Sequence, residues 1–230
     1  SLKYGEYFIN KNTNLDDFQK KLNSGKLYFR KFILIEGTDS RALKLKLDNS
    51  FGLIGNVPKL KEGIYKPDTY KYKWGDTKVS LLKTMEFEQE KILKKHWPSS
   101  KLGNIIKTKE EILILASIIE KETKKKKELE LISSVFVNRL KKKMRLQSDV
   151  TVAFGLNISG NKLNKKYLKE KNSFNTYLNY GLPPTPICYP SELAIKAAFQ
   201  PKKTNYLFFV SDGKGGHRFS KTYAKHKKNI

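Results

Sequence analysis

Residues 108–123 read TKEEILILASIIEKET, the most apolar segment of the chain. Thr108 can cap the first turn of a helix, and Glu111 stands three residues later, which is the spacing of a capping box. Residues 112–119 are apolar on every side of the predicted helix. A helix that is apolar all round is buried in a core rather than lying on a surface. We therefore expect a central buried helix over residues 108–124.

Glu120 follows directly on this apolar run. At ~100° per residue, Ile112, Ala116, Ile119 and Glu120 share one side of the helix, whereas Glu122 projects about 160° away from Glu120. Burial disfavours the ionised carboxylate, so we expect the pKa of Glu120 to rise towards neutrality. A carboxyl group that stays protonated near pH 7 can act as a general acid. The alternative is a structural ion pair between Glu120 and a neighbouring lysine.

Composition and charge restrict the class of protein. The chain has 230 residues, 38% hydrophobic residues and a formal net charge of +25, so it is globular and strongly basic. Only five of its 47 basic residues are arginine, which argues against a specific nucleic-acid reader and for general attraction to an anionic polymer or membrane surface.

The longest apolar run is too short to cross a bilayer, and the one cysteine, Cys188, forms no internal disulfide. No HExxH or CxxC motif is present, so we expect no metal and no cofactor.

Hydrophobic periodicity and turn residues predict an α+β fold. Segments 61–75 and 174–190 are expected to be irregular because they are rich in glycine, tyrosine or proline. The predicted helices are 12–26, 40–51, 78–97, 108–124, 126–144, 191–201 and a short one at the C-terminus, and the predicted strands are 2–9, 27–37, 206–212 and 217–220.

Two polar motifs stand outside the predicted core. Gln147, Ser148 and Asp149 lie on a loop after a helix, where they either bind sugar hydroxyls or cap a turn. The glycine-rich segment 212–217, DGKGGH, leads into a strand rather than a helix, so it is a hairpin turn and not a phosphate-binding loop. His217 at its end is ambiguous between a structural and a functional role.

Several segments together resemble the YceG-like family of endolytic murein transglycosylases. The resemblance rests on LASIIEKET, FVNRL, MRLQSDVTVAFGL, NTYLNYGLPPTPICYP and NYLFFVSDGKGGHRFSKTYAKH, in that order. Upstream, LKYGEY, FILIEGTDS and EGIYKPDTYKY are similar to the LysM-like segment of that family. The chain departs from the pattern at Val150, where proline is expected, and at Phe154, where tyrosine is expected.

The resemblance implies a LysM-like module over residues 1–60 and a catalytic domain over residues 61–230, with a helical core and a C-terminal β-hairpin. It implies cleavage of the β-1,4 bond between N-acetylmuramic acid and N-acetylglucosamine inside glycan strands, which leaves 1,6-anhydro ends. It places the catalytic glutamate at Glu120, with Glu122 as its rival. The residues expected to bind substrate are Gln147, Ser148, Asp149, Tyr177, Gly181, Leu182, Pro183, Pro184 and His217, with Asp212 as a weaker candidate.

The resemblance also implies peptidoglycan as the partner, together with peptidoglycan synthases, and an N-terminal membrane anchor outside this chain that holds this part on the periplasmic side of the inner membrane. Two other functions stay open at this point. One is a glycan-binding module without catalysis, and the other is a basic nucleic-acid binder, which a steep salt dependence would reveal.

Overall fold

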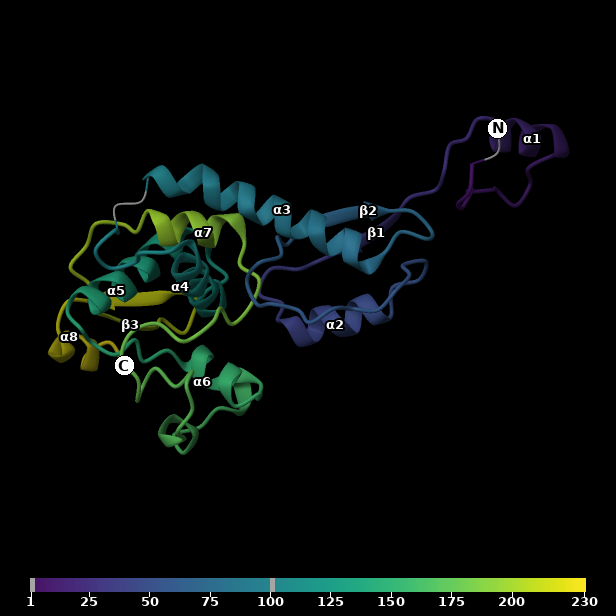
Figure 1. Ribbon diagram of the computed structural model, residues 1–230. Helices are drawn as coiled ribbons and strands as arrows, with labels where there is room; N and C mark the ends of the chain where they lie inside the picture. The colour runs from purple at the N-terminus through teal and green to yellow at the C-terminus, as the bar shows by residue number, and fades with distance from the viewer. Residues whose placement is uncertain (1–2, 100–101) are drawn as a thin grey trace.

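The computed structural model describes residues 3–99 and 102–230, which form two packed bodies and a separate N-terminal helix (Figure 1). Mixed helices and two small antiparallel sheets confirm the α+β class. Within the described residues, no helix is both long enough and apolar enough to cross a bilayer. The helices are α1 (Leu15–Asn23), α2 (Ser40–Asp48), α3 (Lys78–His96), α4 (Lys109–Glu122), α5 (Leu129–Lys141), α6 (Asp149–Gly155), α7 (Glu192–Phe199) and α8 (Tyr223–Lys227), and the strands are β1 (Arg30–Ile33), β2 (Thr69–Tyr72), β3 (Phe208–Ser211) and β4 (His217–Ser220).

Helix α4 is the buried centre of the larger body, as the sequence predicts. Its capping box is complete, because the Glu111 backbone N–H donates to Thr108 Oγ1 at 3.1 Å and the Thr108 N–H donates to Glu111 Oε2 at 3.2 Å. Every residue from Ile112 to Ile119 is buried. The helix packs against α5, α6 and α7, so three neighbouring helices fix its position.

Helix α3 connects the two bodies, as Figure 1 shows. Its N-terminal half contributes Leu81, Leu82 and Met85 to the core of the smaller body, around α2 and the β1–β2 sheet. Its C-terminal half contributes Ile92 and Leu93 to the core of the larger body. The smaller core runs from Phe32 to Met85 and also takes in Tyr189, so residue 60, the predicted domain boundary, lies inside it.

Three local expectations differ from the structure. Residues 3–9 of the predicted strand 2–9 are not a strand, although Glu6 forms an ion pair with Arg30 at 2.7 Å. Strand β1 is shorter than the predicted strand 27–37, because only four residues find a partner. That partner, β2, lies within the predicted loop 61–75, where Tyr70 and Tyr72 alternate with exposed residues as in a half-buried strand. The other predicted elements form with ends shifted by a few residues.

The proline-rich segment 174–190 is irregular, as expected, and packs closely on the junction between the two bodies. A Cβ added to Gly63 would lie 2.6 Å from Pro186 Cγ, and Gly63 has a φ of +80°. We predict that Gly63→Ala lowers the free energy of unfolding by about 3 kcal/mol, because it adds a steric clash to backbone strain. Chemical denaturation measures this change.

Gly55→Ala is the matched control. Gly55 has a similar φ of +83°, but nothing lies within 4 Å of its added Cβ. That variant should lose only about 1 kcal/mol. Equal losses in the two variants would show that the contact with Pro186 does not constrain the junction.

Candidate functional site

Glu122, the last residue of α4, is a carboxyl group held in a desolvated environment. Its side chain is half-buried, and Ser148 Oγ donates a hydrogen bond to Glu122 Oε1 at 2.5 Å. Burial is the largest influence and raises the pKa of Glu122 from 4.5 to about 7. The Ser148 hydrogen bond opposes this rise, the negative charge of Asp149 adds to it, and the positive charges of His217 and Arg139 oppose it.

Ser148 is itself fixed by buried hydrogen bonds. It is 2% exposed, its backbone N–H donates to Thr176 Oγ1 at 2.9 Å, and its carbonyl accepts from Thr151 Oγ1 at 2.7 Å. The preceding residue, Gln147, has a φ of +49°, which is a strained conformation for a residue other than glycine. Such strain is typical of functional loops, and here it leaves the Gln147 side chain exposed while the Ser148 hydroxyl faces Glu122.

Asp149 and Tyr177 form a second pair beside Glu122. Tyr177 Oη donates to Asp149 Oδ1 at 2.6 Å. Burial, with Asp149 as the next cause, raises the pKa of Tyr177, so the phenol stays protonated and remains the donor. Asp149 is exposed and close enough to Glu122 to affect its titration, so a desolvated carboxyl and a solvated carboxylate stand side by side.

Arg139 joins the loop of Ser148 to the C-terminal hairpin. This buried arginine donates from Nη1 to the Leu146 carbonyl at 2.6 Å and from Nε to the Leu207 carbonyl at 2.7 Å. Arg139 therefore positions two backbone segments from separate parts of the chain around Glu122.

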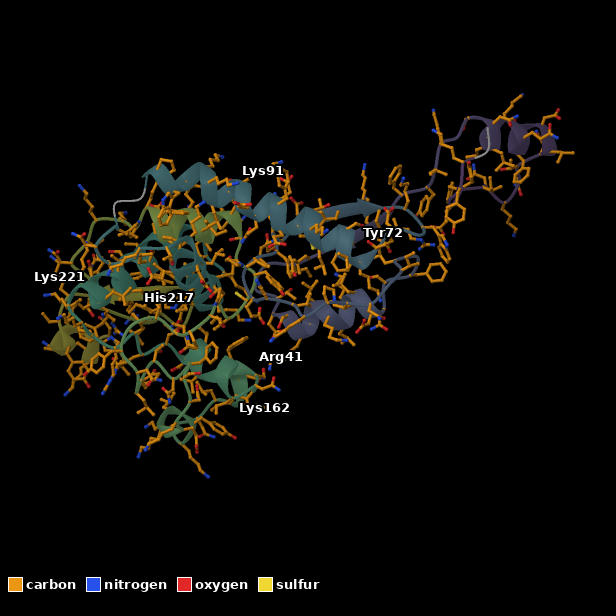
Figure 2. All side chains as sticks on the ribbon, in the orientation of Figure 1. Arg41, Tyr72, Lys91, Lys162, His217 and Lys221 are labelled. Carbon is orange, nitrogen blue, oxygen red and sulfur yellow. The ribbon has the colours of Figure 1, made fainter. Side chains whose placement is uncertain are left out.

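The hairpin is docked through His217 and Glu128. His217 Nδ1 lies 2.7 Å from Glu128 Oε2, and the His217 backbone N–H donates to Glu128 Oε1 at 3.2 Å. Figure 2 shows His217 within the larger body, on β4. Asp212 has a structural role, because it accepts from the backbone of Lys214 and Gly216 in the turn, and those bonds hold the pKa of Asp212 below its ordinary value.

Glu120 does not occupy the apolar environment that the helical-wheel argument predicts. Its Oε2 accepts from the Ser191 backbone N–H at 2.9 Å and from Ser191 Oγ at 2.5 Å. Glu120 lines a hollow of about 750 Å³ between the two bodies, on a different side of α4 from Ser148. The apolar run ends at Ile119, so Glu120 already lies at the edge of the core. The rival residue, Glu122, which projects away from Glu120 as the helical wheel predicts, is the one that contacts the Gln147–Asp149 segment.

Residues 181–184, which are also predicted to bind substrate, lie away from Glu122. Gly181, Leu182, Pro183 and Pro184 line a separate hollow of about 480 Å³ at the N-terminal end of α4, together with Thr108 and Glu111. The structure thus brings Ser148, Asp149, Tyr177 and His217 around Glu122, and it places residues 181–184 at the opposite end of the same helix.

Sequence reasoning missed Arg139, Glu128 and Thr176 as parts of this site. Arg139 carried a usable signal, because it is one of only five arginines in a lysine-rich chain and follows an apolar helical run. Within residues 3–99 and 102–230, no group of three or more His, Cys, Asp or Glu residues is placed to hold a metal ion.

Comparisons with known proteins identify the family. The sequence matches the YceG-like family over residues 1–230. The chain belongs to the YceG-like family. A crystal structure of a YceG-like protein from Listeria monocytogenes, itself described as putative, is 30% identical and superposes with a TM-score of 0.71, covering 99% of this chain and 85% of that one.

Two relatives of this YceG-like chain are named endolytic murein transglycosylase. The relative from Bacillus subtilis (strain 168) is 34% identical over 174 residues, which is 75% of this chain and 48% of that protein. The relative from Streptococcus pneumoniae serotype 2 is 33% identical over 178 residues, which is 74% of this chain and 31% of that protein. The chain thus spans half or less of these two relatives.

The raised pKa of Glu122 has a consequence for stability. Since this pKa is about 7 in the folded protein and 4.5 without the fold, ionisation of Glu122 favours the unfolded chain as the pH rises through this range. We predict that Glu122→Gln has nearly wild-type stability at about pH 4 and is more stable than wild type by on the order of 2 kcal/mol at about pH 8. Urea denaturation across pH measures the difference.

Ser148→Ala should increase the pH dependence of stability that Glu122→Gln removes. It removes a hydrogen bond that lowers the pKa of Glu122, so the loss of stability with rising pH should be larger in this variant than in wild type and should continue to higher pH. A constant stability difference between wild type and Glu122→Gln from pH 4 to 8 would contradict the desolvated state of this carboxyl.

Proposed function

We propose that this YceG-like chain is an endolytic murein transglycosylase whose acid and base is Glu122. One observation carries the proposal: the half-buried Glu122 carboxyl, with a pKa raised to about 7, stands next to the segment of Gln147 and Asp149, which are exposed and of residue types that bind sugars. The names of the two relatives support the reaction class. Glu122 takes the role that the sequence resemblance gave to Glu120, because Glu122 contacts Ser148 beside Asp149, whereas Glu120 accepts its hydrogen bonds from Ser191 on another side of α4.

The proposed reaction uses one carboxyl group twice. Protonated Glu122 gives its proton to the glycosidic oxygen, and the bond from that oxygen to the muramyl C1 breaks as C1 gains oxocarbenium character. The Glu122 carboxylate then takes the proton of the C6 hydroxyl of the same sugar, and that oxygen bonds to C1. A 1,6-anhydromuramyl end and a free N-acetylglucosamine hydroxyl result, and no water is consumed. The tethered nucleophile removes the need for the second carboxylate that glycoside hydrolases use.

The neighbours of Glu122 support the two steps. Ser148 donates to the Glu122 carboxylate formed after the first proton transfer, which limits the cost of that charge. Asp149, exposed and oriented by Tyr177, carries a negative charge that can stabilise the oxocarbenium carbon. Gln147 extends into solvent beside them and is available for sugar hydroxyls.

We further propose that the N-terminal residues are a LysM-like glycan-binding module and that the chain acts outside the cytoplasm, held by a membrane anchor beyond its own residues and close to peptidoglycan synthases. The net charge of +25 supports contact with an anionic envelope. A glycan-binding module without catalysis is the alternative function, and product analysis separates it from a lyase.

We predict that Glu122→Gln abolishes cleavage of purified sacculi, with a loss of at least about 10³-fold, because the amide can neither give nor take the proton. Mass spectrometry of the soluble products should show 1,6-anhydromuropeptides for wild type and none for the variant.

Glu120→Gln is the matched control, since Glu120 lies two residues away on the same helix. Its amide oxygen can still accept from Ser191, so we expect activity within about threefold of wild type. Activity in Glu122→Gln together with its complete loss in a folded Glu120→Gln would return the catalytic role to Glu120. Hydrolysed, non-anhydro ends from wild type would contradict the one-carboxyl mechanism.

A further inference from the structure

A lysine-lined groove lies on the larger body, beyond the residues that surround Glu122. It is a hollow of about 770 Å³ between the C-terminal half of α5, the loop before β3 and the end of β4. We call this hollow the lysine groove and define it by the five lysines in its lining: Lys141, Lys142, Lys202, Lys203 and Lys221. The same lining contains no aspartate or glutamate, so its charge is uniformly positive.

These ammonium groups have no carboxylate partners. All five lysines are exposed, and none forms an ion pair with another described residue. Lysines such as Lys44, Lys91 and Lys94 pair with acidic residues, but many other surface lysines do not, so what distinguishes the groove is that five unpaired lysines line one hollow without an acidic residue. Two of the five, Lys141 and Lys142, lie where a helix C-terminus favours cations, but the other three have no such explanation.

The frame that carries the groove is fixed. Asn138 Nδ2 donates to the carbonyls of Thr204 and Tyr206 at 2.8 and 3.0 Å, and Ser134 Oγ lies 2.6 Å from Thr204 Oγ1. The Lys202 backbone N–H donates to the Glu130 carbonyl at 3.1 Å. Because the loop is already ordered on α5, an anionic ligand would not have to order it on binding.

The lining favours an extended chain over a membrane surface. Its apolar members are Val137, Pro201 and Leu207, and none of these is exposed, so the groove offers no apolar side chain for insertion into lipid. The amide of Asn205, which is exposed, lies among the lysines and suits the amides of a peptide.

Arg139 connects the groove to the proposed catalytic residue. Leu207 lines the groove, and its carbonyl accepts from Arg139 Nε, while Arg139 Nη1 holds Leu146, two residues before Ser148. The Leu207 carbonyl at the groove and the Leu146 carbonyl of the Ser148 loop therefore accept from the same guanidinium group, so the lining of the groove begins close to that loop. A peptide of four residues extends at most ~14 Å, so only a surface near the Ser148 loop is within its reach.

We propose that the lysine groove binds the carboxylates of the peptide stem on the muramyl residue whose bond is cleaved. This inference rests on the proposed function, because it assigns the stem of the same substrate to a second surface. The five ammonium groups hold the stem carboxylates by charge rather than by bidentate geometry, so they favour stem-bearing strands without selecting one stem sequence.

The test uses a triple variant, Lys202→Gln with Lys203→Gln and Lys221→Gln, and two substrates. One is murein with intact stems and the other is glycan stripped of stems by an amidase. We expect wild type to have the lower KM on stem-bearing strands, and the triple variant to show a KM about tenfold higher on them, which abolishes the preference. A preference that survives in the triple variant overturns the proposal.

The matched control removes the same charge from another surface. Lys162, Lys165 and Lys166 are exposed on the segment after α6, and Figure 2 shows Lys162 on a different side of the body from Lys221. Their triple change to glutamine should leave the KM for both substrates unchanged. An equal loss of preference in this control would show a general charge effect and overturn the proposal.

Isothermal calorimetry with a synthetic stem tetrapeptide makes the test independent of catalysis. Wild type should bind the peptide, and the groove variant should bind it about tenfold more weakly. Binding of a phosphodiester polymer at the groove, with no binding of the stem peptide, would overturn the proposal in favour of another ligand. If wild type cleaves neither substrate, the proposed function fails, whereas the calorimetry still decides the groove.

Discussion

The hydrogen bond from Ser148 to Glu122, made in a desolvated environment, is the interaction on which the site depends. Burial alone would push the pKa of Glu122 upward, and the Ser148 hydroxyl limits that rise, so the carboxyl titrates near neutrality. A group with this balance can give a proton and take it back at the same pH. The surrounding fold holds Ser148 against the C-terminal end of α4.

The need to hold Ser148 in this position explains several contacts between segments that are far apart in the sequence. The strained backbone at Gln147 turns the Ser148 hydroxyl inward, and Thr176 fixes its amide from a distant loop. Arg139 ties the same loop to the strand that begins the hairpin. Glu128 holds the other strand through His217. Each contact joins segments distant in sequence, so the site forms only when the larger body is folded.

Local patterns in the sequence were sufficient for most helices and for the hairpin. The capping box at Thr108 and the apolar run after it predicted α4 almost to the residue, because both signals are local. The sequence does not predict strand β2, because its alternation is short and lies beside prolines and glycines. A helical wheel does not distinguish Glu120 from Glu122, because both lie at the end of a helix that is apolar all round. What distinguishes the two glutamates is Ser148 on one side and Ser191 on the other, 26 and 71 residues away from their partners.

The central claim is that Glu122 keeps a proton near neutral pH. It is tested most directly by a carboxyl ¹³C NMR titration of the folded protein, with the Glu122→Gln variant used to assign the signal. The account predicts a midpoint of about 7 for Glu122. A midpoint near 4.5, the ordinary value for glutamate, would contradict it.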